Sequence, residues 1–119
     1  MAHLTRIAPE LPALYLPKAS QYYEDKLGFR LAMRMPNDDY AIVERGDIAI
    51  HLFQDETRSH SPAAVHIFTP NVEELFAELM QKGAHVTQEI MLKPWGNRDF
   101  RVVDDSGNQI KFTEPLADK

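Results

Sequence analysis

The order of predicted elements occurs twice along this chain of 119 residues, and that repetition constrains the fold more than any other feature. Each half reads as a strand, a helix that follows a proline and ends at a glycine, and then three more strands. Pro17 and Pro70 lie 53 positions apart (70 minus 17), and Gly28 and Gly83 lie 55 apart (83 minus 28). Two independent landmarks with nearly the same offset indicate a duplicated unit. We therefore predict an α+β fold in which a single domain, 1–119, consists of two βαβββ modules, at about 1–56 and 62–116, with a linker at 54–62.

Hydrophobic periodicity assigns the individual elements. Pro9 and Pro12 interrupt the apolar segment 4–16, which predicts an edge strand or a bulge because proline cannot donate to a strand ladder. The first helix opens at Pro17. The second follows Asn71 and carries apolar residues at the i, i+3, i+4 and i+7 spacing of one helical face, namely Val72, Leu75, Phe76 and Leu79. One helix covers only one face of a four-stranded module, so two modules brought together can enclose a cavity between their open faces.

The C-terminal hairpin, over residues 98–114, carries the polar face that we consider first for function. Apolar and polar residues alternate in both of its strands, which is the period of a half-buried strand. The turn at 104–108 supplies Asx acceptors and a glycine that tolerates positive φ. Strand parity places three charged residues on the face away from the apolar side: Asp99, Arg101 and Lys111.

Composition and motif content exclude several classes of function. The chain has no cysteine, which excludes disulfides, thiolate zinc sites and cysteine nucleophiles. A net charge of −5 argues against nucleic-acid binding, which usually needs a basic patch. No apolar run approaches the roughly 18 residues of a membrane span and no signal-peptide pattern is present, so we expect a cytoplasmic protein with no membrane partner. No nucleophile–base pair, phosphate loop or nucleotide fingerprint appears, and no catalytic residues are predicted.

Two segments carry a resemblance to a known family. The helix at 16–29 bears an aromatic pair and ends in Leu-Gly-Phe, and Pro-Trp-Gly-Asn-Arg-Asp-Phe at 94–100 precedes Asp-Asp-Ser-Gly-Asn at 104–108. Together they resemble the vicinal oxygen chelate superfamily, which includes glyoxalase I, extradiol dioxygenases, fosfomycin-resistance enzymes and bleomycin-resistance proteins. Pro-Trp-Gly at 94–96, Arg-Gly-Asp at 45–47 and the short length are most similar to the bleomycin-resistance proteins.

The resemblance implies a homodimer in which modules from both chains build the cleft. It also implies two very different activities. Metal-dependent members use a divalent ion to chelate vicinal oxygens of the substrate, whereas bleomycin-resistance proteins bind the drug without an essential catalytic metal and sequester it, which confers antibiotic resistance.

Metal-dependent members place one ligand on the first strand and one on the last strand of each module, usually His, Glu or Gln. Counting back from the helix starts assigns the first-strand positions to Ala8 and Ala64, and the last-strand positions are His51 and Lys111. Only His51 can bind a metal, because alanine has no donor and lysine is a cation. We therefore predict no metal cofactor. The alternative is an irregular divalent-metal site formed by Glu10, His51 and His66, since Glu10 and His66 keep the parity of the expected positions.

We predict sequestration of a bleomycin-like drug or another small ligand in the dimer cleft, without catalysis; the alternative is a metal-dependent glyoxalase-like lyase or dioxygenase. An acidic dimer would favour cationic ligands by electrostatic steering. The simpler alternatives are packing for the aromatic residues and a polar lining without a ligand for the others. The predicted apolar walls are Trp95, Phe53 and Phe68, and the predicted polar contacts are His51, His66, Asp99, Arg101 and Lys111.

Overall fold

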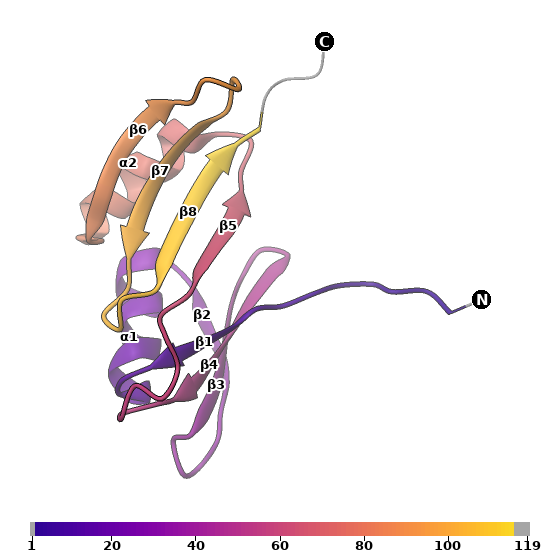
Figure 1. Cartoon of the computed structure of the whole chain (residues 1–119), viewed down its shortest axis with the longest axis vertical. Helices are drawn as coiled ribbons and strands as arrows, with labels where there is room; N and C mark the ends of the chain where they lie inside the picture. Colours follow the sequence, from indigo (N-terminus) through magenta and orange to yellow (C-terminus); the bar gives the residue numbers. More distant parts are fainter. Residues whose placement is uncertain (1, 116–119) are drawn as a thin grey trace.

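The computed structural model describes residues 2–115 and has the predicted βαβββ order twice (Figure 1). The first module contains β1 (Glu10–Ala13), α1 (Leu16–Leu27), β2 (Arg30–Arg34), β3 (Tyr40–Arg45) and β4 (Ile48–Gln54). The second contains β5 (Ala64–Phe68), α2 (Val72–Lys82), β6 (Val86–Leu92), β7 (Arg98–Val103) and β8 (Gln109–Glu114). The predicted fold class is confirmed. The predicted end of the second module, at residue 116, lies outside the described residues.

Each module forms its own four-stranded sheet, in the order β1-β4-β3-β2 and β5-β8-β7-β6. The first strand of each module is an edge strand parallel to the last strand of that module, and the other pairings are antiparallel. In Figure 1, α2 lies behind the second sheet, and no helix covers the face turned toward the viewer within the described chain. In residues 2–115, no helix is long and apolar enough to cross a membrane.

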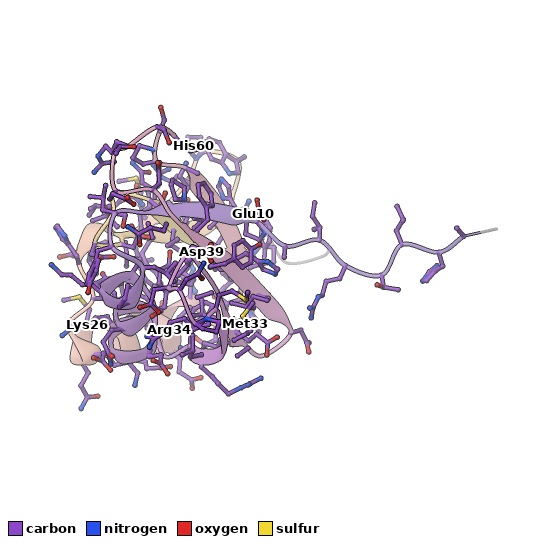
Figure 2. All side chains as sticks on the ribbon, turned by 90° about the horizontal axis from the view of Figure 1, so that it is seen from below. Glu10, Lys26, Met33, Arg34, Asp39 and His60 are labelled. Atoms are coloured by element: carbon purple, nitrogen blue, oxygen red, sulfur yellow. The ribbon has the colours of Figure 1, made fainter. Side chains whose placement is uncertain are left out.

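The first strand is much shorter than the predicted segment 4–16. β1 begins only at Glu10, and residues 2–9 extend from the body as an arm, which Figure 2 shows leaving near the labelled Glu10. The physical reason is the extent of the neighbouring strand. The carbonyl of Pro9 still accepts a hydrogen bond from the His51 amide of β4 (3.0 Å), but the arm before it pairs with no described strand.

Both helices begin and end where the sequence indicates. Pro17 lies in the first turn of α1, where its missing N–H leaves no intrahelical bond unmade. The Asn71 side chain accepts a hydrogen bond from the Glu74 amide (3.1 Å) and so caps α2. Gly28 and Gly83 follow the helices with φ of 73° and 84°, the left-handed conformation that glycine adopts without strain.

One apolar core lies between the helices and the sheets. Tyr23 and Leu27 of α1 are fully buried, as are Leu79 of α2 and Phe100 of β7. The Phe100 ring lies 5.1 Å from the ring centroids of both Phe76 and Phe112. Because the core takes the helix-facing side of each strand, the alternate side chains lie on sheet faces that no described helix covers.

An ion pair connects the two modules at the ends of their helices. Arg45, at the end of β3, donates two hydrogen bonds to the Glu78 carboxylate of α2, at 2.9 and 2.7 Å. The same guanidinium donates to the carbonyl of Leu27, the last residue of α1 (2.9 Å). This two-point contact fixes α2 relative to the first module.

We expect Glu78→Gln to lower the free energy of unfolding at pH 7 by about 0.5–1 kcal/mol, a small effect because both partners are partly solvated. The pKa of Glu78 lies below its ordinary value of 4.5 because Arg45 donates hydrogen bonds to the carboxylate. The stabilisation is therefore complete above that ordinary value and is lost as the pH falls through the folded-state pKa. Urea unfolding from pH 7 to 3 should show the stabilities of the wild-type and Glu78→Gln proteins converging in acid. Glu89→Gln, at an exposed carboxylate of β6, should change the stability little. A loss of stability in Glu78→Gln that does not depend on pH would contradict this assignment.

Candidate functional site

The candidate site lies on the two sheet faces that the helices leave uncovered. Strand register lines up side chains into rows across each sheet. In the first sheet, His51 lies between Glu10 and Ile42. In the second sheet, the matching row crosses all four strands and is made of His66, Lys111, Arg101 and Gln88. The two rows are equivalent positions of the two modules, because His51 and Lys111 both lie on the last strand.

In the first sheet, the Tyr40 hydroxyl connects the two polar residues of the row. It donates to Glu10 Oε2 (2.6 Å) and lies 2.7 Å from His51 Nδ1. One hydroxyl has one proton, so donation to Glu10 leaves the hydroxyl oxygen to accept the second bond from His51 Nδ1–H. Burial, and then the bond to Glu10, raise the pKa of Tyr40 to about 12, so the phenol remains protonated at neutral pH.

Tyr40 was not among the predicted site residues. The sequence contained a usable signal, because Tyr40 lies opposite Phe53 across β3 and β4 and therefore shares the uncovered face.

In the second sheet, the row is cationic. Arg101 and Lys111 lie directly opposite each other on β7 and β8, and His66 lies next to Lys111 on β5. Within residues 2–115, neither Arg101 nor Lys111 forms a salt bridge. Like charges directly opposite each other destabilise a sheet, so this arrangement is not explained by folding stability.

The register corrects the predicted positions of the metal ligands. Glu10, not Ala8, lies opposite His51, and His66, not Ala64, lies opposite Lys111. Ala64 pairs with Gln109, and Ala8 precedes β1. Counting back from the helix start failed because the stagger between the first and last strands of a module is not a local property of the sequence.

Within one chain, the corrected set does not form a divalent metal centre. Three of its members, Glu10, His51 and His66, are possible ligands, but the ammonium of Lys111 takes the fourth position and repels a cation. The Tyr40 hydroxyl also bonds both Glu10 and His51. His66 lies on the other sheet, and in the described part of the chain no three His, Asp or Glu side chains come close enough to hold a metal.

Asp99, which was predicted to contact a ligand, lies in a buried cluster of polar side chains. The residue is only 4% exposed, and Oδ1 accepts a hydrogen bond from Gln88 Nε2 (2.7 Å) and lies 3.6 Å from Lys93 Nζ. Lys93 also donates to Gln88 Oε1 (3.1 Å). These three side chains tie β6 to β7 at the base of the connecting loop, so we assign Asp99 to holding that loop instead of contacting a ligand.

Trp95 lies in the loop that this cluster supports. The loop is a tight turn, in which the Lys93 amide donates to the Asn97 carbonyl and the Gly96 amide donates to the Lys93 carbonyl, both at 2.8 Å. The Trp95 side chain is 65% exposed. An aromatic residue on a well-fixed loop is suited to stack on a planar ligand.

The predicted aromatic walls belong to different sheets. Phe53 contacts the His60 ring of the linker (centroids 5.0 Å apart), and Phe68 stacks on His66 (6.4 Å). A groove of about 490 Å³ between β4 and β5 includes His66 and Phe68 in its lining, with Ile7 of the arm along it. In one chain, the predicted residues His66, Phe68, Arg101 and Lys111 therefore lie together on the second sheet. His51 and Phe53 lie on the first sheet, and Trp95 lies in the loop between β6 and β7.

Two βαβββ modules, each with a helix on one face of a four-stranded sheet and a polar row on the other, define a protein of the glyoxalase and bleomycin-resistance fold class. The chain belongs to the glyoxalase/bleomycin resistance protein/dioxygenase superfamily, whose family model matches residues 3–112. It is 29% identical to a bleomycin resistance protein of Geobacillus stearothermophilus, over 91% of this chain and 95% of that protein.

The chain is also similar to solved structures with this fold. A bleomycin-binding protein from bleomycin-producing Streptomyces verticillus, complexed with copper(II)-bleomycin, is 26% identical with a TM-score of 0.78, over 97% of this chain and 99% of that chain. A bleomycin resistance determinant encoded on the transposon Tn5 is 20% identical with a TM-score of 0.83, over 96% of this chain and 100% of that chain. The second likeness shows the fold alone.

Proposed function

We propose that this protein binds a bleomycin-like small molecule in a cleft built by two copies of the chain and sequesters it without chemical conversion. The observation that carries the proposal is Lys111, a cation at the register position where the metal-dependent members of the family need a ligand. A site that contains an ammonium group in place of a metal ligand is better suited to binding a small molecule directly than to holding a metal ion that chelates it. The names of the relatives, a bleomycin resistance protein and a bleomycin-binding protein, support bleomycin as the first ligand to test.

The proposed dimer follows from what a single chain leaves exposed. Leu4 and Ile7 of the arm are each 93% exposed, and Phe68 and Leu92 of the second sheet are 64% and 67% exposed. Apolar side chains exposed to this extent are typical of surfaces that pack against another molecule. A second copy that covers the open sheet faces would bury these side chains and enclose the two polar rows in one cleft.

Titration with bleomycin tests the proposal. At a ligand concentration of 100 times Kd, we expect about 2.7 kcal/mol of added stability and a rise in melting temperature of several degrees. Light scattering should give a dimer, and mass spectrometry should recover the ligand unchanged. Trp95→Ala should weaken binding about tenfold, as expected for the loss of one stacking contact, whereas Tyr15→Ala, at a similarly exposed aromatic of the first module, should not. A monomer, a converted ligand or no thermal shift would contradict the proposal.

A metal-dependent lyase or dioxygenase is the second candidate. It is favoured by three N/O donors, Glu10, His51 and His66, at the register positions that the family uses. Stoichiometric divalent metal in the protein as purified would replace the sequestration proposal with this one.

A further inference from the structure

We infer that the cationic row of the second sheet, His66, Lys111, Arg101 and Gln88, recognises an anionic oxygen group, such as a carboxylate, on a small aromatic ligand. The inference rests on the proposed function for the cleft built by two copies, and it names the chemistry of a ligand for that cleft independently of bleomycin. It also changes the expectation drawn from net charge, since an acidic chain would by itself attract cations.

The charges of the row are not neutralised within the described chain. Some cations elsewhere in residues 2–115 are paired, such as Arg45 with Glu78 and Arg98 with Glu73 and Glu114, and others, such as Lys18 and Lys82, form no salt bridge. Arg101 and Lys111 have no such partner in residues 2–115. They differ from the other unpaired cations because they lie directly opposite each other in the sheet. The acid nearest along the strand, Asp99, is already paired with Lys93 and bonded to Gln88. An incoming anion is therefore the group that would remove the repulsion between the two cations.

Buried donors on the same face point independently to a ligand. In the described residues, three buried side-chain atoms lack a hydrogen-bond partner, and two of them are Arg101 Nε and Thr113 Oγ1. Thr113 is 4% exposed and lies two residues after Lys111, so the two residues share a sheet face. A buried donor without an acceptor is costly, and an anionic oxygen that these side chains rotate to meet can accept from guanidinium, ammonium and hydroxyl donors alike. Phe68, opposite Thr113, supplies an apolar surface beside them.

Glu10 of a second copy is the competing occupant. In the proposed dimer the first-sheet row faces the second-sheet row, and Glu10 is the only acid of that first-sheet row. One carboxylate against the two cations Arg101 and Lys111 leaves one positive charge, and Glu10 already accepts a hydrogen bond from Tyr40. The facing rows therefore remain net cationic with Glu10 in place.

The test compares naphthalene-2-carboxylate with 2-naphthamide, which have similar shape and differ in charge. We expect the carboxylate to bind the wild-type protein at least about tenfold more tightly in calorimetry, with the difference decreasing as salt is added. Lys111→Gln and Arg101→Gln should each remove most of that preference while their melting temperatures stay equal or rise, because repulsion is relieved. Lys82→Gln, which removes the same charge from α2 on the other side of the sheet, should keep it.

Equal binding of the two compounds, binding of neither, or a preference that survives both substitutions would overturn the inference. A preference that appears only in Glu10→Gln would also overturn it, because the row would then be neutralised by Glu10 of the second copy. The bleomycin titration is read separately. Bleomycin binding without a carboxylate preference refutes this inference alone, and a carboxylate preference without bleomycin binding refutes the choice of bleomycin alone.

Discussion

Asp104→Ala is expected to lower the free energy of unfolding by about 3–4 kcal/mol, a large effect for a single substitution. Asp104 is 4% exposed, and its carboxylate accepts four hydrogen bonds. Oδ1 accepts from the amides of Ser106 and Asn108, both at 2.9 Å, and Oδ2 accepts from the Tyr23 hydroxyl (2.8 Å) and from Asn108 Nδ2 (2.9 Å). Its removal leaves buried donors of three residues without an acceptor, and that loss costs more than the bonds themselves contribute.

The turn that Asp104 organises reaches other parts of the chain. Asn108 donates to the Pro12 carbonyl of β1 (2.8 Å) and accepts from the Ala63 amide just before β5 (2.9 Å), and Ser106 accepts from the Leu14 amide (2.9 Å). The turn of the second module thus holds the first strand of each module. We expect urea unfolding followed by circular dichroism and by Trp95 fluorescence to shift together in Asp104→Ala.

Asp105→Ala is the matched control for this prediction. Burial, and then the charge of Asp104, raise the pKa of Asp105, so its ionised form is disfavoured in the folded state. Its removal at pH 7 should cost less than about 1 kcal/mol or stabilise the fold. Similar losses in the two variants would show that the turn tolerates the loss of either side chain and would refute the role given to Asp104.

The sequence predicted the fold because its signals are local. A proline before a helix, a glycine after it and alternation within a strand depend on neighbouring residues only, and their recurrence at nearly constant offsets indicated the duplication. The extent of β1 was not predictable in this way. A strand lasts only as long as it has a partner, and β4 provides one for Glu10–Ala13 but not for the segment before Pro9.

The sequence predicted the sheet face on which each candidate site residue lies, but not which of these residues lie opposite each other. Strand parity placed His51, His66, Arg101 and Lys111 on the uncovered faces, because parity is also local. The pairing of Glu10 with His51 depends on how the chain between β1 and β4 brings these two strands side by side, and no local sequence pattern encodes that arrangement. Asp99 has the expected parity, yet irregular pairing in β6 places Gln88 opposite Arg101 within bonding distance of the Asp99 carboxylate. A bulge of this kind has no strong sequence signal.

Lys111→Glu is expected to convert the proposed cleft from a cationic site into a divalent-metal site. In the proposed dimer, Glu10 and His51 of one copy face His66 and position 111 of the other, so a carboxylate there completes four N/O donors. Two unit charges about 4 Å apart interact by about 4 kcal/mol near a protein surface. Replacing repulsion by attraction should therefore tighten Co²⁺ binding on the order of a thousandfold or more, measured by calorimetry and visible absorption.

Gln109→Glu is the matched control, since it adds the same carboxylate on the same strand and face but opposite Ala64 instead of His66. It should leave Co²⁺ binding weak. The donors of one chain lie on two separate sheets, so the metal should also hold the Lys111→Glu protein as a dimer at dilutions where the metal-free protein dissociates. Equal Co²⁺ affinity in the two variants, or tight binding by a monomer, would show that the two rows do not face each other. The proposed cleft would then have to be assigned to another pairing of the sheets, and the role proposed for Lys111 in selecting the charge of the ligand would be refuted.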